Sequence, residues 1–252
     1  MKKLTKLVAA VAALAFTLTA FVSCGKNGNG NTIKFGTNAE FPPFEFISAN
    51  GVIDQFDGID MAIAKQIADD YKKNVKIENI EFDSLLIALQ NGQLDAVIAG
   101  MTVTEERKLS VDFSIPYYTA TQVIIVKEGS PIKSAADLDG KLTSVVQGYT
   151  GETCVSELGY KYESFKKGTE CIMELVNGKC DAVVIDSATA QKYISDNPGL
   201  VIVEDANVFA HEEYAIAVKK GNTELLNQIN ASITKMLSAG TIAELGDKYC
   251  GN

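Results

Sequence analysis

The sequence predicts an α/β fold in which mainly parallel β-sheets are covered by helices, because segments with a strand pattern alternate with segments with a helical pattern. Strands are expected at 32–36, 75–81 and 95–98, and helices at 60–71 and 83–90. Apolar residues at the spacing of one helical face support the first helix; they are Ala64, Ile67, Ala68 and Tyr71. A long amphipathic helix near the C-terminus is predicted from Leu226, Ile229, Ile233, Met236 and Leu237.

A weak internal repeat predicts two lobes of like construction. Residues 89–98 (LQNGQLDAVI) are echoed by residues 175–184 (LVNGKCDAVV). Both are typical of a helix that ends at a glycine in the left-handed conformation, followed by a short buried strand. The alternative is that this connector is common and has no wider meaning. Because open α/β sheets bind ligands beyond the carboxyl ends of their strands, residues 99–102 and 186–187 are expected to face a cleft.

The first residues predict secretion. Three lysines precede an almost wholly apolar stretch at 7–18, and small residues lead to Cys24; this is the signal-peptide pattern, so residues 1–23 are expected to be removed. The position of Cys24 resembles the lipobox of bacterial lipoproteins, which implies lipidation of Cys24, although Phe21 replaces the usual Leu. Plain secretion, with Cys24 removed or free, is the alternative. Residues 24–31 then form a flexible tether without apolar side chains.

Charge and cysteine content narrow the class of protein. Without residues 1–23, which hold three lysines and no acidic residue, 20 basic residues face 32 acidic ones. That balance argues against nucleic acid and against anionic lipid headgroups as partners. The four remaining cysteines permit disulfides, at most one or two, and Cys171 and Cys180 are expected not to pair with each other because a helix separates them. With His211 as the single histidine, no metal site and no cofactor are predicted.

Several residues could hold a free amino acid. Its α-carboxylate requires an Arg and N–H groups at a helix N-terminus. Arg107 lies in a predicted first helical turn capped by Thr104 and can fold back toward Thr102. Thr150 lies in a glycine-containing loop at 147–152 that enters a helix, so its hydroxyl and the N–H groups after it could bind the carboxylate. Asp186 ends an apolar strand, where a carboxylate either caps the next helix or accepts the α-ammonium group.

The loop at 36–46 carries three aromatic residues around the adjacent prolines Pro42 and Pro43, which stiffen it. Phe41 or Phe44 could therefore wall a pocket, and ordinary core packing is the alternative for each.

Taken together, five segments resemble the polar-amino-acid binding proteins of ABC importers, such as the glutamine-, histidine- and lysine/arginine/ornithine-binding proteins. They are GTNAEFPPFEF (36–46), GIDMAIAKQIA (58–68), FDSLLIALQNGQLDAVIAGMTVTEERKLSVDFSIPYY (82–118), VVQGYTGE (145–152) and CDAVVIDSATA (180–190). The resemblance implies a two-lobed periplasmic-binding-protein type II fold with a hinge of two crossing strands near 118–123 and 208–214. Lobe one would comprise 32–119 and 212–252, and lobe two 120–211.

The resemblance also implies roles for single residues. Arg107, Thr102, Thr150 and Gly151 would bind the α-carboxylate, and Asp186 and the backbone of Gly100 the α-ammonium group. The ligand's side chain would lie between Phe41 and Phe82, with its far end near Asn38, Ala99, Val146 and Gln147. Two positions depart from the family: Ala62 replaces an acid, and Asn38 replaces an Asp that meets cationic or amide side chains.

The ligand expected from these residues is a polar or cationic L-amino acid, with arginine and glutamine nearly level. Glu40, two residues beyond Asn38, would favour arginine if it faced the pocket, whereas an outward Glu40 would leave Asn38 to bind an amide. The expected partner is the membrane permease of an ABC transporter, and a monomer is the default.

The sequence leaves two other classes of protein to consider, an enzyme and a sensor domain. Some prephenate or arogenate dehydratases resemble this fold, but they need a general acid near the ligand, for which only Glu40 and Glu152 are candidates. No nucleophile–base pair is recognisable, so an enzyme is not expected. A receptor-type sensor domain would continue into membrane helices or signalling domains.

Overall fold

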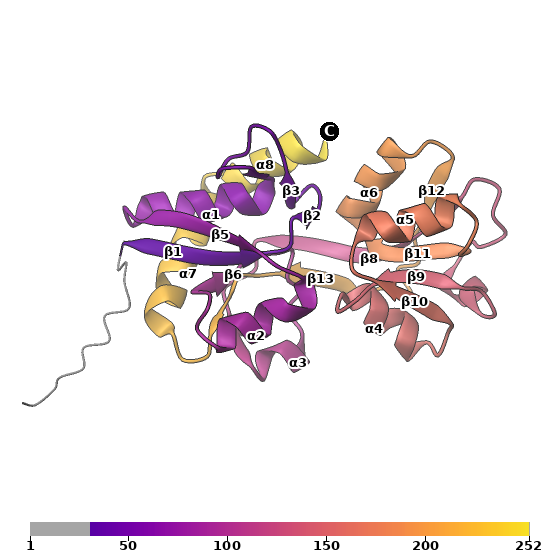
Figure 1. Ribbon diagram of the computed structural model, residues 1–252, viewed down its shortest axis with the longest axis horizontal. Helices are drawn as coiled ribbons and strands as arrows, with labels where there is room; N and C mark the ends of the chain where they lie inside the picture. Colours follow the sequence, from indigo (N-terminus) through magenta and orange to yellow (C-terminus); the bar gives the residue numbers. More distant parts are fainter. Residues whose placement is uncertain (1–30, 252) are drawn as a thin grey trace, which may run out of the picture. The chain divides into compact units, whose positions relative to one another are not determined.

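The computed structural model describes residues 31–251 and confirms an α/β protein (Figure 1). The predicted signal peptide, Cys24 and nearly all of the tether lie outside the described residues. The strands are β1 (Thr32–Thr37), β2 (Glu40–Phe41), β3 (Glu45–Ile47), β4 (Phe56–Asp57), β5 (Asn74–Asn79), β6 (Ala96–Val97), β7 (Val111–Phe113), β8 (Tyr118–Lys127), β9 (Thr143–Val146), β10 (Tyr162–Phe165), β11 (Ala182–Asp186), β12 (Leu200–Val203), β13 (His211–Tyr214) and β14 (Ala217–Lys219). The helices are α1 (Ile59–Asp70), α2 (Leu85–Gln90), α3 (Glu105–Lys108), α4 (Thr150–Glu157), α5 (Gly168–Val176), α6 (Ser187–Asp196), α7 (Thr223–Ser238) and α8 (Thr241–Cys250), with 3₁₀ turns η1 (Phe82–Ser84) and η2 (Ala135–Leu138).

Lobe 1 is built on a five-stranded sheet in the order β5-β1-β6-β14-β7. Strand β1 pairs in parallel with β5 and β6, and β14 closes the sheet by antiparallel pairing with β6 and β7. Helix α1 packs against β1, α7 and α8, and α2 packs against β1, β6 and β14. Because helices cover both faces, the inner strands are apolar on both sides, as the fully buried Ala96, Val97 and Ile98 show.

Lobe 2 is built on a second sheet in the order β10-β9-β11-β8-β12. Strands β10, β9 and β11 run parallel to each other. Strand β8 pairs with β11 in antiparallel orientation, and β12 pairs with β8 in antiparallel orientation. Helix α4 contacts β9, β10 and β11, while α5 and α6 contact β11, β8 and the neighbouring strands. Figure 1 shows α4 on the opposite side of this sheet from α5 and α6.

Strand β8 joins the two lobes. Its residues 122–127 pair within the lobe 2 sheet, whereas residues 118–121 pair with β13 in antiparallel register, from Tyr118 opposite Tyr214 to Thr121 opposite His211. The chain passes back toward lobe 1 through β13, and Thr102 forms a bridge with Tyr214. The predicted pair of crossing strands is therefore present, and the two-lobed fold class is confirmed.

The two halves of the internal repeat have the predicted form. Helix α2 and helix α5 both end before a glycine with positive φ, Gly92 at 72° and Gly178 at 71°. Strands β6 and β11 follow. The helix expected at 83–90 begins as the 3₁₀ turn η1. In α7, Leu237 is exposed rather than packed (46% of its surface), whereas its neighbour Met236 is buried, so Leu237 lies outside the buried face of the helix.

The cysteines within the described residues are free thiols. Cys171 and Cys180 are buried in lobe 2, and Cys154 and Cys250 are half-buried. No helix between residues 31 and 251 is long and apolar enough to cross a bilayer.

Candidate ligand-binding cleft

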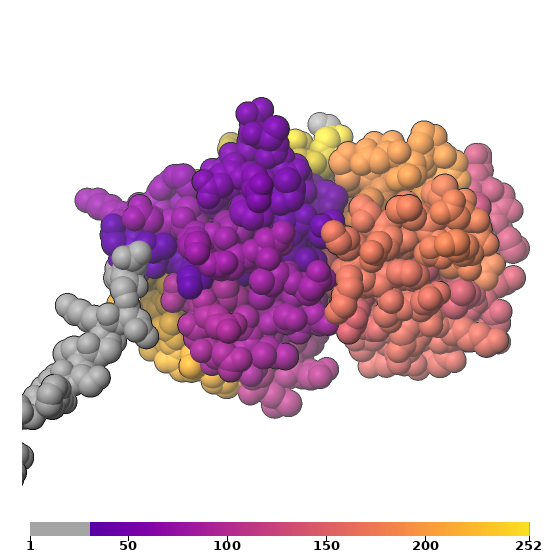
Figure 2. All heavy atoms as spheres, viewed as in Figure 1, coloured from indigo at the N-terminus to yellow at the C-terminus, as the bar shows by residue number. Residues whose placement is uncertain are grey.

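Residues of both lobes meet directly along one boundary (Figure 2), and two ion pairs cross it. Glu40 pairs with Lys167 at 2.8 Å, and Asp83 with Lys166 at 2.7 Å. Two cavities adjoin at this boundary. The larger has a volume of about 1000 Å³ and the smaller of about 10 Å³. Four residues line both of them: Phe82, Thr102, Arg107 and Thr150.

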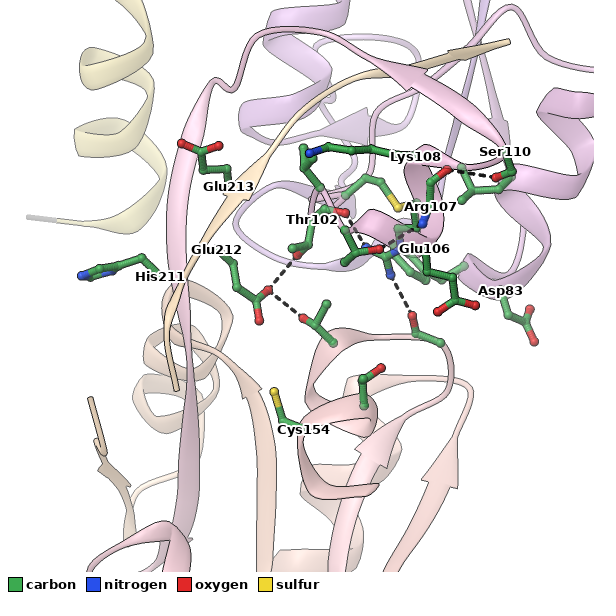
Figure 3. Close-up of a pocket in the computed structure, with 18 of the residues that line it drawn as sticks. Asp83, Thr102, Glu106, Arg107, Lys108, Ser110, Cys154, His211, Glu212 and Glu213 are labelled. Carbon is green, nitrogen blue, oxygen red and sulfur yellow. Dashed lines mark hydrogen bonds between the residues drawn. The ribbon is translucent and has the colours of Figure 1, made fainter. Parts of the chain in front are cut away.

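Arg107 lies at the centre of the boundary (Figure 3). It stands in the first turn of α3, where Thr104 caps the helix by accepting a hydrogen bond from the Arg107 amide at 3.1 Å. Its guanidinium donates from Nη1 to the Thr102 carbonyl (2.7 Å) and from Nη2 to the Gly148 carbonyl (2.9 Å). It also lies over the Phe82 ring, 5.3 Å from its centroid. Arg107 therefore binds lobe 1 and lobe 2 together while three of its five N–H groups stay free for a ligand.

Thr102 and Thr150 converge on one carboxylate oxygen. Both hydroxyls donate to Oε2 of Glu212, at 2.8 and 2.7 Å. Thr102 belongs to lobe 1, Thr150 begins α4 in lobe 2, and Glu212 is in β13 (Figure 3). Burial lowers the pKa of Arg107, and the negative charge of Glu212 opposes that shift. This corner of the cleft thus already holds a carboxylate beside a cation.

A second carboxylate, Asp186, also lines the smaller cavity. It ends β11 and stands at the N-cap position of α6, but it makes no side-chain cap bond there. Instead its Oδ1 accepts a hydrogen bond from the Tyr214 hydroxyl at 2.6 Å. Burial, and next the charge of Glu212, raise the pKa of Asp186 to about 7. Asp186 is therefore a buried carboxylate without a cationic partner among the described residues.

More buried acid lies behind this corner. Asp60, at the start of α1, accepts hydrogen bonds on Oδ2 from the Gly100 amide (2.8 Å) and the Tyr117 hydroxyl (2.9 Å). Burial raises its pKa to about 6, although these two bonds oppose the shift. Burial and the charge of Asp60 raise the pKa of Glu45 well above its ordinary value. Asp60 thereby fixes the orientation of the Gly100 peptide at the cavity wall.

Gly100 also allows an aromatic ring to approach closely. Its φ is +52°, and a Cβ at this position would lie 2.6 Å from the Phe41 ring. A side chain here would be strained in its backbone conformation and would collide with Phe41. Ala99, beside it, lines the same small cavity.

The two aromatic residues expected to sandwich a ligand are separated by a third ring. Tyr149 lies edge-on to Phe41, with centroids 5.3 Å apart, and to Phe82, with centroids 4.5 Å apart. Only 7% of its surface is exposed. Phe44 does not line either cavity and packs against Tyr118 and Tyr214. Burial raises the pKa of Tyr149 well above its ordinary value.

The remaining predicted residues lie around this centre. Asn38 is buried and donates to the Ile80 carbonyl at 3.1 Å. Glu40 is engaged by Lys167, and the Gln147 side chain is exposed. A Cβ on Gly151 would lie 2.8 Å from Gln122, so α4 packs its first turn tightly on lobe 2. Of the predicted set, the cavities are lined by Phe41, Phe82, Ala99, Gly100, Thr102, Arg107, Thr150 and Asp186.

Glu212 and Tyr149 were not predicted. Period-two alternation on β13 could have indicated Glu212, because it places Glu212 and Tyr214 on one side and Glu213 on the other. No comparable signal existed for Tyr149, since a residue after a glycine turn can point in several directions. Among residues 31–251, no group of three or more His, Cys, Asp or Glu side chains could hold a metal ion.

The geometry defines a class of protein: a two-lobed α/β binding protein whose cleft has a guanidinium and hydroxyls at one end and a buried carboxylate at the other. The chain belongs to the bacterial extracellular solute-binding proteins, family 3, whose model matches residues 33–252. The resemblance predicted from the sequence is thus confirmed.

Named relatives agree with this assignment. The chain is 35% identical to a probable histidine-binding protein of Neisseria gonorrhoeae, over 94% of this chain and 93% of the relative. It is 32% identical to the arginine-binding extracellular protein ArtP of Bacillus subtilis, over 99% and 98%. Among solved structures, an ancestral arginine-binding protein bound to glutamine superposes with a TM-score of 0.82 at 43% identity, covering 89% of this chain and all of that one (100%).

Proposed function

We propose that this protein captures a free polar or cationic L-amino acid between its two lobes and delivers it to the permease of an ABC importer. The position of Arg107 carries the proposal, because its guanidinium contacts lobe 1 and lobe 2 and retains free donors beside the cleft. Relatives named for histidine and arginine, and a neighbour bound to glutamine, support this ligand class.

In this proposal the two ends of the cleft bind the two charges common to all amino acids. Arg107, the hydroxyls of Thr102 and Thr150, and the Gly151 amide bind the α-carboxylate, with the N-terminus of α4 adding its partial positive charge. Asp186 and the Gly100 carbonyl accept the α-ammonium group. Phe41 and Phe82 enclose the ligand's side chain, and Ala99 limits its volume. No residue is assigned a catalytic role, and binding is expected to leave the ligand chemically unchanged.

The choice between arginine and glutamine depends on the far end of the pocket. Glu40 could attract a guanidinium, but its carboxylate already accepts a hydrogen bond from Lys167. Asn38 is neutral and uses its amide N–H on Ile80. Neither Asn38, Glu40 nor Gln147 lines either of the two adjoining cavities, so their roles at the specificity end depend on how far the ligand extends. An ion pair that includes Glu40 reduces the advantage of a cationic ligand and keeps arginine and glutamine level.

Calorimetry with arginine, glutamine and histidine tests the ligand class on the parent and on Glu40→Gln. Micromolar or tighter binding of arginine or glutamine is expected. Preference for arginine that disappears in Glu40→Gln would assign the side-chain contact to Glu40, and an unchanged preference would remove Glu40 from the site. Tight binding of a dicarboxylic or branched aliphatic amino acid, with arginine and glutamine silent, would contradict the proposal.

The same proposal includes the protein's location and its parts. Residues 1–23 act as a signal peptide, a lipid on Cys24 anchors the chain to the outer face of the membrane, and residues 24–31 act as the tether. Lobe one spans 32–119 and 212–252, lobe two spans 120–211, and the protein works as a monomer. Metabolic labelling with a palmitate analogue should mark the parent but not Cys24→Ala. Equal labelling of both would contradict the anchor.

A further inference from the structure

The hydroxyl donors assigned to a ligand's carboxylate are already used by Glu212. Each threonine hydroxyl carries one hydrogen to donate. Thr102 and Thr150 both donate theirs to the same Glu212 oxygen, and Thr150 additionally accepts a hydrogen bond from Gln122 Nε2 at 3.0 Å. An incoming carboxylate therefore gains these two donors only if Glu212 gives them up.

The Glu212 contacts also hold the lobes together. Thr102 belongs to lobe 1 and Thr150 to lobe 2, so one carboxylate oxygen bridges the cleft. Hydrogen bonds to an ionised acceptor are roughly twice as strong as bonds between neutral groups. The backbone supports this placement, because Val103 donates to the Glu213 carbonyl at 2.9 Å and Ala215 donates to the Met101 carbonyl at 3.1 Å. These bonds fix β13 beside the segment that carries Thr102.

The place of a ligand's side chain is filled as well. Tyr149 lies between Phe41 and Phe82, and the cavity that remains among them has a volume of about 10 Å³. That space holds at most about one water molecule and no amino-acid side chain of the size of arginine or glutamine. Tyr149 directly follows Gly148, whose carbonyl accepts from Arg107, so it belongs to the loop through which Arg107 contacts lobe 2.

We propose that, without an amino acid, the two lobes close on the chain's own Glu212 carboxylate and Tyr149 ring, and that the ligand binds by displacing both. This inference rests on the proposed function for the identity of the ligand. Glu212 takes the place of the ligand's α-carboxylate, and Tyr149 takes the place of the ligand's side chain. These two residues therefore compete with the amino acid for its binding site. The apparent affinity for an amino acid is the intrinsic affinity multiplied by the fraction of molecules that are not in this self-occupied state.

Small-angle scattering and calorimetry on the parent, Glu212→Gln, Glu212→Ala, Tyr149→Ala and the Glu212→Ala/Tyr149→Ala double variant test the inference. Glu213→Gln is the matched control, because Glu213 is the next residue on β13 and points away from the two threonines (Figure 3). The ligand-free double variant should have a larger radius of gyration than the ligand-free parent. Arginine or glutamine should bind Glu212→Ala about tenfold more tightly than the parent, and Glu212→Gln should show a smaller gain.

Glu213→Gln should match the parent in both measurements. An unchanged radius of gyration in the ligand-free double variant, or weaker binding by both Glu212 variants, would overturn the inference. The scattering of the ligand-free proteins decides it even if none of the tested amino acids binds, an outcome that would instead contradict the proposed function.

Discussion

The two ends of the cleft differ in the charged groups that they hold. At the Arg107 end, two threonine hydroxyls donate to the Glu212 carboxylate, and the negative charge of Glu212 acts on the nearby Arg107 guanidinium. At the Asp186 end, a buried carboxylate accepts a hydrogen bond from the Tyr214 hydroxyl. Asp60 and Glu45 are buried nearby, and within residues 31–251 no lysine or arginine forms an ion pair with any of these three acids. Burying a charge without a partner is costly, so such a group shifts its pKa toward neutrality. The Arg107 end therefore holds both a cation and an anion before a ligand binds, whereas the Asp186 end gains its cation from the ligand's ammonium group.

The largest expected effect on ligand binding is at the Arg107 end of the cleft. Arg107→Ala should weaken binding of arginine or glutamine by at least about a hundredfold, because it leaves the ligand's buried carboxylate without its cation. Arg107→Lys keeps the charge but loses the planar fork that contacts both lobes, so it should also weaken binding strongly. Calorimetry measures both. Affinities within threefold of the parent would remove Arg107 from the carboxylate site.

Asp186→Asn should come next, with a loss of about tenfold or more, and it should also change the pH dependence. With a pKa of about 7, Asp186 in the free protein is increasingly protonated as the pH falls below 7. It must lose that proton to pair with the ammonium group, so the parent's affinity should fall on acidification from pH 8 to pH 5.5.

Binding at pH 6 should therefore release protons, which calorimetry in buffers of different ionisation enthalpy detects. Asp186→Asn should bind weakly but almost independently of pH. A parent whose affinity is flat between pH 8 and pH 5.5 would show that Asp186 is not the ammonium acceptor.

The buried acidic residues should also make the stability of the folded protein depend on pH. Burial raises the pKa of Asp60 to about 6 and that of Asp186 to about 7. Between pH 4 and pH 7 the folded chain therefore holds more protons than the unfolded chain, and raising the pH through this window lowers the free energy of unfolding. The ligand-free Tm should be several degrees higher at pH 5 than at pH 8.

Asp60→Asn should reduce this slope, whereas Asp139→Asn, at an exposed position in lobe 2, should leave it unchanged. Thermal melts at both pH values provide the measurement. A Tm that rises between pH 5 and pH 8 would contradict the pKa directions given for these two groups.

The smallest expected effect concerns the helix cap that supports Arg107. Thr104 accepts a hydrogen bond from the Arg107 amide and caps the short helix α3. Thr104→Ala should cost about 1 kcal/mol of stability and weaken ligand binding only a few-fold, because the Arg107 side-chain contacts remain. Denaturant unfolding and calorimetry measure the two effects. Val103→Ala, which keeps the cap, is a suitable comparison for side-chain truncation in this segment.

Local patterns in the sequence predicted several central strands and helices and the region of the site. Helical spacing predicted α1 and α7, and the paired Asn-Gly connectors predicted two units of like construction. Residues next to strand ends, such as Thr102 and Asp186, were found because the carboxyl ends of buried strands face a cleft. The wider resemblance added Phe82, which no local pattern marks, and the role of the Gly100 backbone as an acceptor.

Tertiary structure alone decided which of these groups meet and what lies between them. Tyr149 fills the space between Phe41 and Phe82, Glu212 accepts from Thr102 and Thr150, and Lys167 engages Glu40. Each contact joins residues from different lobes or from the hinge, between 62 and 127 positions apart in the chain. The orientation of such side chains depends on how the lobes close and on which charges then lack partners. Sequence periodicity shows which face of a helix or strand is buried. These contacts depend instead on which charged and polar groups meet between the two lobes, and that boundary exists only in the folded chain.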